Sequence, residues 1–83
     1  MTGVLKAKVH VFLKPGVLDV QGKAVEAELH TLGWDGVSNV RVGRAIEFQI
    51  AGDDPTRARD EVNRMCERLL ANPVIEGYRV EVA

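Results

Sequence analysis

The chain has 83 residues, of which 28% are charged and 46% are apolar, and its formal net charge is −1. This length allows one domain with a small core, so association with another chain is a reasonable expectation. The charge balance lacks the basic excess that binding to nucleic-acid phosphates requires, and no apolar run is long enough to cross a membrane. A single cysteine excludes an internal disulfide framework. We therefore expect a cytoplasmic protein that binds neither nucleic acid nor membrane.

The first expected element is a β-strand over residues 4–14, where apolar and polar side chains alternate. Its apolar face comprises Leu5, Ala7, Val9, Val11 and Leu13. Its opposite face carries Lys6, Lys8, His10 and Phe12. One face of the sheet should therefore be covered by helices, while the other remains open and carries mixed charges and one aromatic ring.

A helix is expected next, over residues 20–32. Asp19 is a favourable N-cap, and Gly33 supplies the glycine that commonly ends a helix. Between them Val25, Leu29 and Leu32 follow helical spacing. Trp34 comes directly after the stop, where its large apolar body either covers the end of the core or anchors an interface. We expect the first of these roles.

Two alternating runs, residues 37–42 and 45–50, predict a β-hairpin. A two-residue loop would place apolar and polar side chains on the same face. A three-residue loop over residues 43–45 instead pairs Val42 with Ile46 and Val40 with Phe48, which puts all four apolar side chains on the core face. We therefore expect the three-residue loop.

A second helix is expected to begin with Asp54 as N-cap and Pro55 at the first helical position, and to end before Asn72-Pro73. Its predicted buried stripe consists of Ala58, Val62, Met65 and Leu69. A last strand follows, with Tyr78, Val80 and Val82 facing inward. This order predicts an α+β, ferredoxin-like split βαβ domain, in which two helices cover one face of a four-stranded antiparallel sheet.

No arrangement of residues points to catalysis. Cys66 lies within the second helix and is expected to be a buried structural thiol rather than a nucleophile. His10 and His30 come from different elements without the ligand spacing of a metal site, and the glycines do not form a phosphate-binding loop. We expect no catalytic residue, no metal and no cofactor in this chain.

Three segments nevertheless resemble one known family. Residues 14–22 (KPGVLDVQG), 40–47 (VRVGRAIE) and 69–78 (LLANPVIEGY) are similar to the patterns LKxxVLDPQG, VRxGKxxE and CExLLANxVIExY of the PurS family, and Cys66-Glu67 fit the start of the third pattern. The chain departs from the family at Val20, usually proline, and at Arg44, often lysine. The resemblance extends over essentially the whole chain.

PurS is the small subunit of phosphoribosylformylglycinamidine synthase, and the resemblance implies a non-catalytic role. In this family a glutaminase subunit, PurQ, releases ammonia from glutamine. A synthetase subunit, PurL, uses that ammonia with ATP and Mg²⁺ to amidate formylglycinamide ribonucleotide, and PurS bridges the two. A homodimer, or a dimer of dimers, is also implied.

The motif positions imply a set of docking residues for these partners: Lys14, Asp19, Gln21, Gly22, Arg41, Gly43, Arg44, Asn72, Glu76 and Tyr78. Several of them have alternative roles in folding, as cap, turn or core residues. Lys14, Gln21, Arg41 and Arg44 have no evident folding role and are the stronger candidates. Gly22 either allows a close backbone approach by a partner or is a tolerated glycine in the first turn of the helix.

Three other functions of this fold are less favoured. A small-molecule sensor of the ACT type is usually attached to an enzyme. An acylphosphatase-like enzyme needs an arginine after the first strand, where this chain has Lys14-Pro15-Gly16. An RNA-binding sheet needs several stacking aromatic residues on its open face, which here offers only Phe12.

Overall fold

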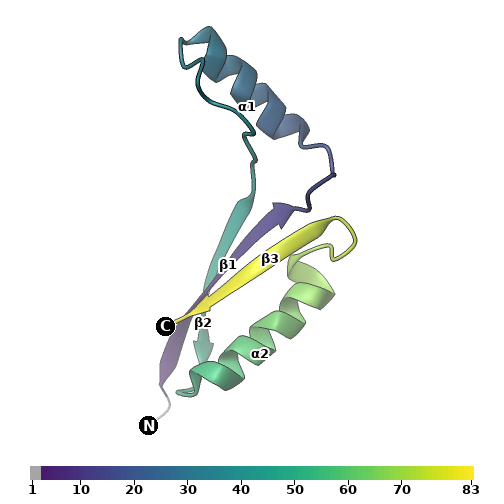
Figure 1. The fold of residues 1–83 in the computed structure, drawn as a ribbon. Helices are drawn as coiled ribbons and strands as arrows, with labels where there is room; N and C mark the ends of the chain where they lie inside the picture. Colours follow the sequence, from purple (N-terminus) through teal and green to yellow (C-terminus); the bar gives the residue numbers. More distant parts are fainter. Residues whose placement is uncertain (1–2) are drawn as a thin grey trace.

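The computed structural model describes residues 3–83 as an α+β chain (Figure 1). Its elements are β1 (Val4–Leu13), α1 (Val20–Thr31), β2 (Arg44–Ala51), α2 (Pro55–Met65), the π-helical segment η1 (Cys66–Leu70) and β3 (Glu76–Val82). The three strands form one antiparallel sheet in the order β2-β1-β3. The predicted α+β class is confirmed, and β1 is the central strand.

The register of the sheet is set by β1. Val9 lies between Ile46 of β2 and Val80 of β3, so the apolar side chains of all three strands share one face. On the other face Lys8 lies between Glu47 and Glu81. The alternation predicted for the first strand is confirmed, because Ala7, Val9 and Val11 are buried.

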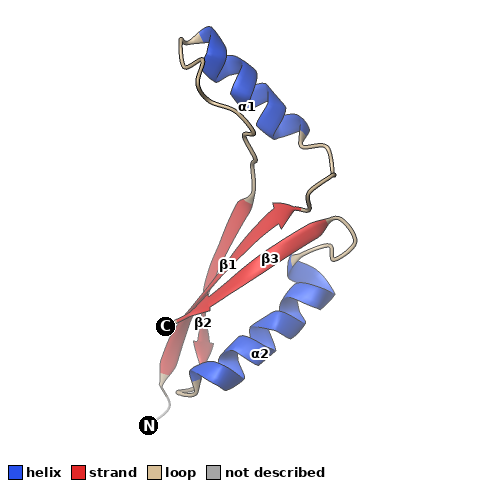
Figure 2. Cartoon of the chain, in the orientation of Figure 1, coloured by secondary structure: helices blue, strands red, loops and turns tan. Residues whose placement is uncertain are grey.

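The core lies between this sheet face and α2 with its extension η1 (Figure 2). Val62 and Cys66 are fully buried, which confirms the structural role expected for the thiol. The predicted stripe is wrong at its C-terminal end, because Met65 is 37% and Leu69 is 83% exposed. Cys66 and Leu70 contact the core instead, because they continue the four-residue spacing from Val62 and the wider π turn of η1 keeps Leu70 on that side.

The predicted helix caps are confirmed. Asp19 accepts a hydrogen bond from the Gly22 N–H group, and Asp54 accepts from Thr56 and Arg57 ahead of Pro55. At the end of α1 the N–H groups of Gly33 and Trp34 donate to the carbonyl groups of His30 and Leu29. This pattern, with Gly33 at φ 106°, is a Schellman stop.

The predicted hairpin is wrong. Residues 37–42 form no strand, and β2 begins at Arg44 beside Val11 of β1. The sheet described for residues 3–83 therefore has three strands, and a fourth is absent from it. The N–H groups of residues 40 and 42 are instead bonded to carboxylates of Glu26 and Asp19, which lie 14 and 23 positions away in the sequence.

The expectation that two helices cover one sheet face is also wrong, because only α2 does so. Helix α1 projects beyond the end of the sheet, and the whole molecule measures 54 × 26 × 15 Å (Figure 1). We call residues 18–43 the arm and residues 37–42 its return segment. Leu32 is 67% and Trp34 is 59% exposed, so the core role expected for Trp34 is wrong in the single chain.

Candidate functional site

The base of the arm is organised by a buried carboxylate. Asp19 is only 4% exposed, and its two oxygens accept hydrogen bonds of 2.7 Å from the N–H groups of Val42 and Gly22. These two bonds, assisted by the nearby charge of Arg41, hold the pKa of Asp19 below its ordinary value. Asp19 thus joins the start of α1 to the end of the return segment.

The Arg41 side chain also bonds segments at the base of the arm. Its guanidinium donates to the carbonyl oxygens of Leu13, Lys14 and Val17 at 3.3–3.4 Å, and its Nε lies 3.9 Å from Asp19. Arginine suits this position because its donors diverge in a fixed plane and reach several acceptors at once. The segment between β1 and α1 is therefore fixed to the return segment.

Helix α1 also contacts the return segment along its length. Glu26 accepts a 3.1 Å hydrogen bond from the Val40 N–H group, which lowers the pKa of Glu26, and the His30 ring lies 2.7 Å from the Val37 carbonyl oxygen. A methyl group at Gly22 would collide with the Val40 carbonyl oxygen. Gly22 therefore has a close backbone neighbour in the chain's own return segment, and its approach by a partner stays a prediction.

A second group of contacts lies at the neighbouring end of β3. Arg44 forms a 2.7 Å ion pair with Glu76 and donates to the Leu70 carbonyl oxygen, while Glu76 also accepts from the Asn72 N–H group at 2.7 Å. The hydrogen bond from Arg44 is the main cause that lowers the pKa of Glu76 and raises that of Arg44. Lys14 donates to the Pro73 carbonyl oxygen. This network fixes the loop between η1 and β3.

Several of the predicted docking residues meet at one concave surface. A pocket of about 390 Å³ is lined by Asp19, Gln21, Gly43, Arg44 and Glu76, together with apolar residues of β1 and the arm. Of the other predicted residues, Arg41 donates to Leu13, Asn72 donates to Glu76 and Gly22 donates to Asp19, and each of these acceptors lines the pocket. Lys14 bonds to Pro73 outside this lining. The expectation that Lys14, Arg41 and Arg44 have no folding role is wrong, because each one bonds neighbouring segments.

Tyr78 lies apart from this pocket. Its hydroxyl donates a 2.7 Å hydrogen bond to Glu67 of η1, and this bond together with burial raises the pKa of Tyr78 to about 12. Burial also raises the pKa of the neighbouring Cys66 thiol. Tyr78 therefore joins β3 to η1 with a partly buried ring, close to the inward position expected for it.

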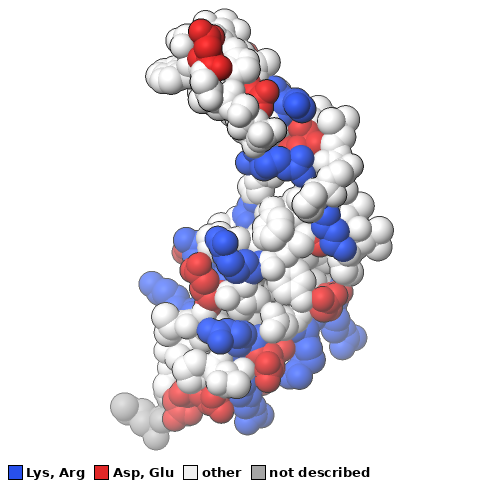
Figure 3. Space-filling view, in the orientation of Figure 1, with Lys and Arg blue, Asp and Glu red and all other residues white. Residues whose placement is uncertain are grey.

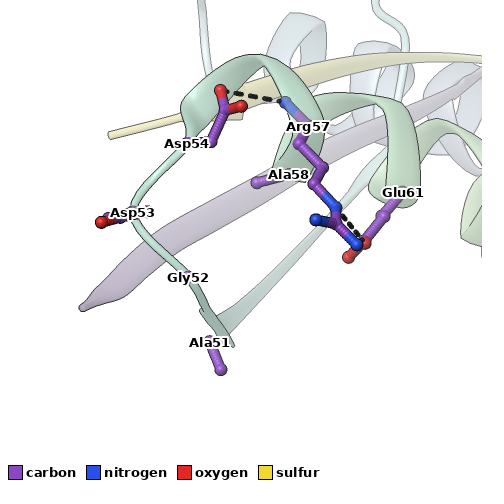
Figure 4. Close-up of a pocket in the computed structure, with 7 residues that line it drawn as sticks. All are labelled: Ala51, Gly52, Asp53, Asp54, Arg57, Ala58 and Glu61. Carbon is purple, nitrogen blue, oxygen red and sulfur yellow. Dashed lines mark hydrogen bonds and ion pairs between the residues drawn. The ribbon is translucent and has the colours of Figure 1, made fainter. Parts of the chain in front are cut away.

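The face of the molecule drawn in Figure 3 carries charges of both signs. Figure 3 shows lysine, arginine and acidic side chains interspersed over the visible face. A pocket at the far end, lined by Asp53, Asp54 and Arg57 among others, contains the Arg57–Glu61 ion pair (Figure 4). Within residues 3–83 no helix is long and apolar enough to span a membrane, and no group of three His, Cys, Asp or Glu could hold a metal.

Sequence reasoning missed the roles of Glu26 and His30. Both contact the return segment, and together with Asp19 and Gly22 they recur every three or four positions along the helix. That spacing places them on one face of α1. This pattern is present in the sequence, but it consists of polar residues and a glycine, whereas apolar spacing is what normally indicates the packed face of a helix.

Comparison with known proteins identifies the family. A family model described as PurS, phosphoribosylformylglycinamidine (FGAM) synthase, matches residues 6–83. The chain is 50% identical over 78 residues to phosphoribosylformylglycinamidine synthase subunit PurS of Bacillus subtilis. The aligned residues cover 93% of this chain and 90% of that protein.

Solved structures agree with this assignment. One similar structure is that of Methanocaldococcus jannaschii PurS, one of the subunits of formylglycinamide ribonucleotide amidotransferase in the purine biosynthetic pathway. Its TM-score is 0.85 and its identity is 37%, over 95% of both chains. A chain in the structure of PurLQS from Thermotoga maritima has a TM-score of 0.88 and 28% identity, over 98% of this chain and 99% of that one. The chain therefore belongs to the PurS family, whose curated relatives are named as subunits of phosphoribosylformylglycinamidine synthase.

Proposed function

We propose that the chain is a non-catalytic subunit of a cytoplasmic phosphoribosylformylglycinamidine synthase, where it bridges a PurQ-type glutaminase and a PurL-type synthetase and assists ammonia transfer to formylglycinamide ribonucleotide. ATP and Mg²⁺ are used by the synthetase subunit in this proposal. The observation that carries it is the likeness, over nearly the whole of both chains, to a chain of the PurLQS structure.

The geometry of the candidate site supports a scaffolding role. Asp19, Arg41, Arg44 and Glu76 are engaged with one another or with backbone groups, so they fix the shape of the pocket rather than offering a proton or a nucleophile. Gln21 lines the same pocket on the exposed start of α1. We propose that this rigid concave surface, including Gln21, contacts a partner subunit.

Self-association is also part of the proposal. Helix α1 lies off the sheet, and Leu32 and Trp34, which follow it, are exposed. Strand β2 is an edge strand of the three-stranded sheet. We propose that two copies pack through their arms, and that residues 37–42 of one copy complete a four-stranded, ferredoxin-like sheet beside β2 of the other. A dimer of dimers is a further level of the same assembly.

The test is glutamine-dependent amidation of formylglycinamide ribonucleotide by purified PurL- and PurQ-type subunits, with and without the chain. Ammonium chloride serves as the alternative nitrogen source. We expect the chain to raise only the glutamine-dependent rate and to co-elute with both subunits. An unchanged glutamine-dependent rate would contradict the bridging role.

A matched pair of variants localises the contact. Gln21→Ala removes a side chain that lines the pocket, whereas Gln49→Ala removes one from the open sheet face opposite Lys6. We expect Gln21→Ala to weaken co-elution while the thermal midpoint is unchanged, and Gln49→Ala to affect neither. Equal behaviour of the two variants would show that the pocket is not the docking surface.

A further inference from the structure

Three side chains bind three different backbone groups of the return segment. Asp19 accepts from the Val42 N–H group at 2.7 Å, Glu26 accepts from the Val40 N–H group at 3.1 Å, and the His30 ring lies 2.7 Å from the Val37 carbonyl oxygen. We call Asp19, Glu26 and His30 the backbone clamp. Their spacing along the chain puts all three on one face of α1, next to the return segment.

The two carboxylates of the clamp bond residues 40–42, which follow the left-handed conformation of Asn39 (φ 56°). In an extended chain, alternate residues direct their N–H and C=O groups to the same side, so Val40 and Val42 share one edge. A hairpin with a three-residue loop over residues 43–45 would bond Val42 to Ile46 across that edge. The two carboxylates therefore take the same N–H groups that hairpin closure would need.

Two further contacts fix this arrangement. Helix α1 lies very close to the return segment at Gly22, because a methyl group there would collide with the Val40 carbonyl oxygen. Arg41 uses its side chain to hold the segment that leads into α1. The arm is thus bonded internally between α1 and the return segment, and Arg41 bonds it to residues 13–17 before it.

We propose that the backbone clamp is a conformational lock. It holds residues 37–42 against α1, prevents them from folding back onto β2 of the same chain, and so leaves the outer edge of β2 open. The last step, in which that open edge receives a second copy, rests on the self-association proposed above. The lock itself does not depend on it.

Amide hydrogen exchange measured by NMR on the full chain tests the lock. Glu26→Ala removes the acceptor for the Val40 N–H group, whereas Glu28→Ala makes the same change of charge and helix propensity at an exposed position of α1. Glu26→Gln retains an acceptor oxygen and serves as the conservative rescue. Light scattering over a concentration series of each variant reports self-association.

We expect exchange at Val40 to accelerate about tenfold or more in Glu26→Ala, because a hydrogen bond to a charged acceptor is lost. Glu28→Ala should leave that rate unchanged, and Glu26→Gln should restore most of the protection.

Glu26→Ala should also lower the dimer fraction at a given concentration. Equal exchange at Val40 in all three variants would overturn the lock. A wild-type chain that stays monomeric with Val40 protected would retain the lock and refute self-association instead.

Discussion

Tyr78 is the single tyrosine of the chain, so its ionisation can be followed alone by absorbance. Its pKa of about 12 lies above the ordinary value of about 10, because the hydroxyl donates to Glu67 and is partly buried. The folded chain therefore keeps this proton in a range where the unfolded chain loses it. The resulting stabilisation is complete below about pH 10 and disappears as the pH rises through 12.

We expect Glu67→Gln to lower the absorbance midpoint toward pH 10, because the acceptor loses its charge. Glu61→Gln makes the same change on α2, where Glu61 pairs with Arg57, and should leave the midpoint unaltered. Circular dichroism must be recorded in parallel to establish that the chain is folded. A wild-type midpoint near pH 10 with a native spectrum would contradict the Tyr78–Glu67 bond.

Gly22 gives a second prediction for a single residue. Alanine is normally better than glycine in a helix by about 1 kcal/mol. At residue 22, however, the added methyl group meets the Val40 carbonyl oxygen, so we expect Gly22→Ala to lower the free energy of unfolding by about 1–3 kcal/mol.

Gly36→Ala is the control for that substitution. A Cβ atom at residue 36 meets no described atom within 4 Å, and Gly36 is not among the residues with positive φ. The change should be neutral or stabilise by about 0.5 kcal/mol. Urea denaturation measures both variants, and a stabilised Gly22→Ala chain would mean that α1 and the return segment are not in contact.

Helix α2 and its π-helical extension decide which apolar residues form the core. Val62 is fully buried, whereas Leu69, which has the larger side chain, is 83% exposed. We expect Val62→Ala to lower the free energy of unfolding by about 2 kcal/mol and Leu69→Ala to change it by less than about 0.5 kcal/mol. Urea denaturation of the two variants distinguishes this arrangement from the regular stripe, in which Leu69→Ala would cost more.

The elements that could be predicted are those fixed by local chemistry. The alternation of apolar and polar residues predicts β1, and the capping residues predict both ends of α1 and the start of α2. The absence of the hairpin could not be predicted, because alternation in residues 37–42 does not show which groups its backbone bonds or that Asn39 adopts a left-handed conformation at φ 56°. Which groups bond its N–H donors depends on Asp19 and Glu26, which lie 14–23 positions away.

The candidate site was predictable in part for the same reason. The family motifs picked out Asp19, Arg41, Arg44 and Glu76, and the structure brings these residues to one end of the sheet. Their bonds to one another were not predictable, since each joins segments that are distant in sequence. The π turn at η1 was also invisible, because the residues from Cys66 to Leu70 have ordinary helical propensities.

The molecule as a whole is elongated, with a sheet at one end and the arm at the other. Trp34 is its single tryptophan and lies beyond the end of α1 with 59% of its surface exposed. If two copies pack through their arms as proposed, the emission of Trp34 should shift to shorter wavelength as dimers form. Fluorescence and light scattering over one dilution series should therefore follow the same transition.

Leu32→Ala should move that transition to higher concentration, because Leu32 is exposed near Trp34. Val4→Ala, which removes an exposed apolar side chain at the opposite end of the molecule, is the matched control. An emission spectrum that stays constant while the light-scattering mass doubles would exclude the arm from the interface.

The central position of β1 has a consequence for synthesis on the ribosome. Strand β1 is made first, but its second edge pairs only with β3, so the sheet stays incomplete until residues 76–82 have emerged. At about 5–20 residues per second this leaves the first strand open for seconds. The bonds of the arm, in contrast, join residues 19–42 to one another and Arg41 to Leu13, so the arm can form during that interval, before the sheet to which it is attached is complete.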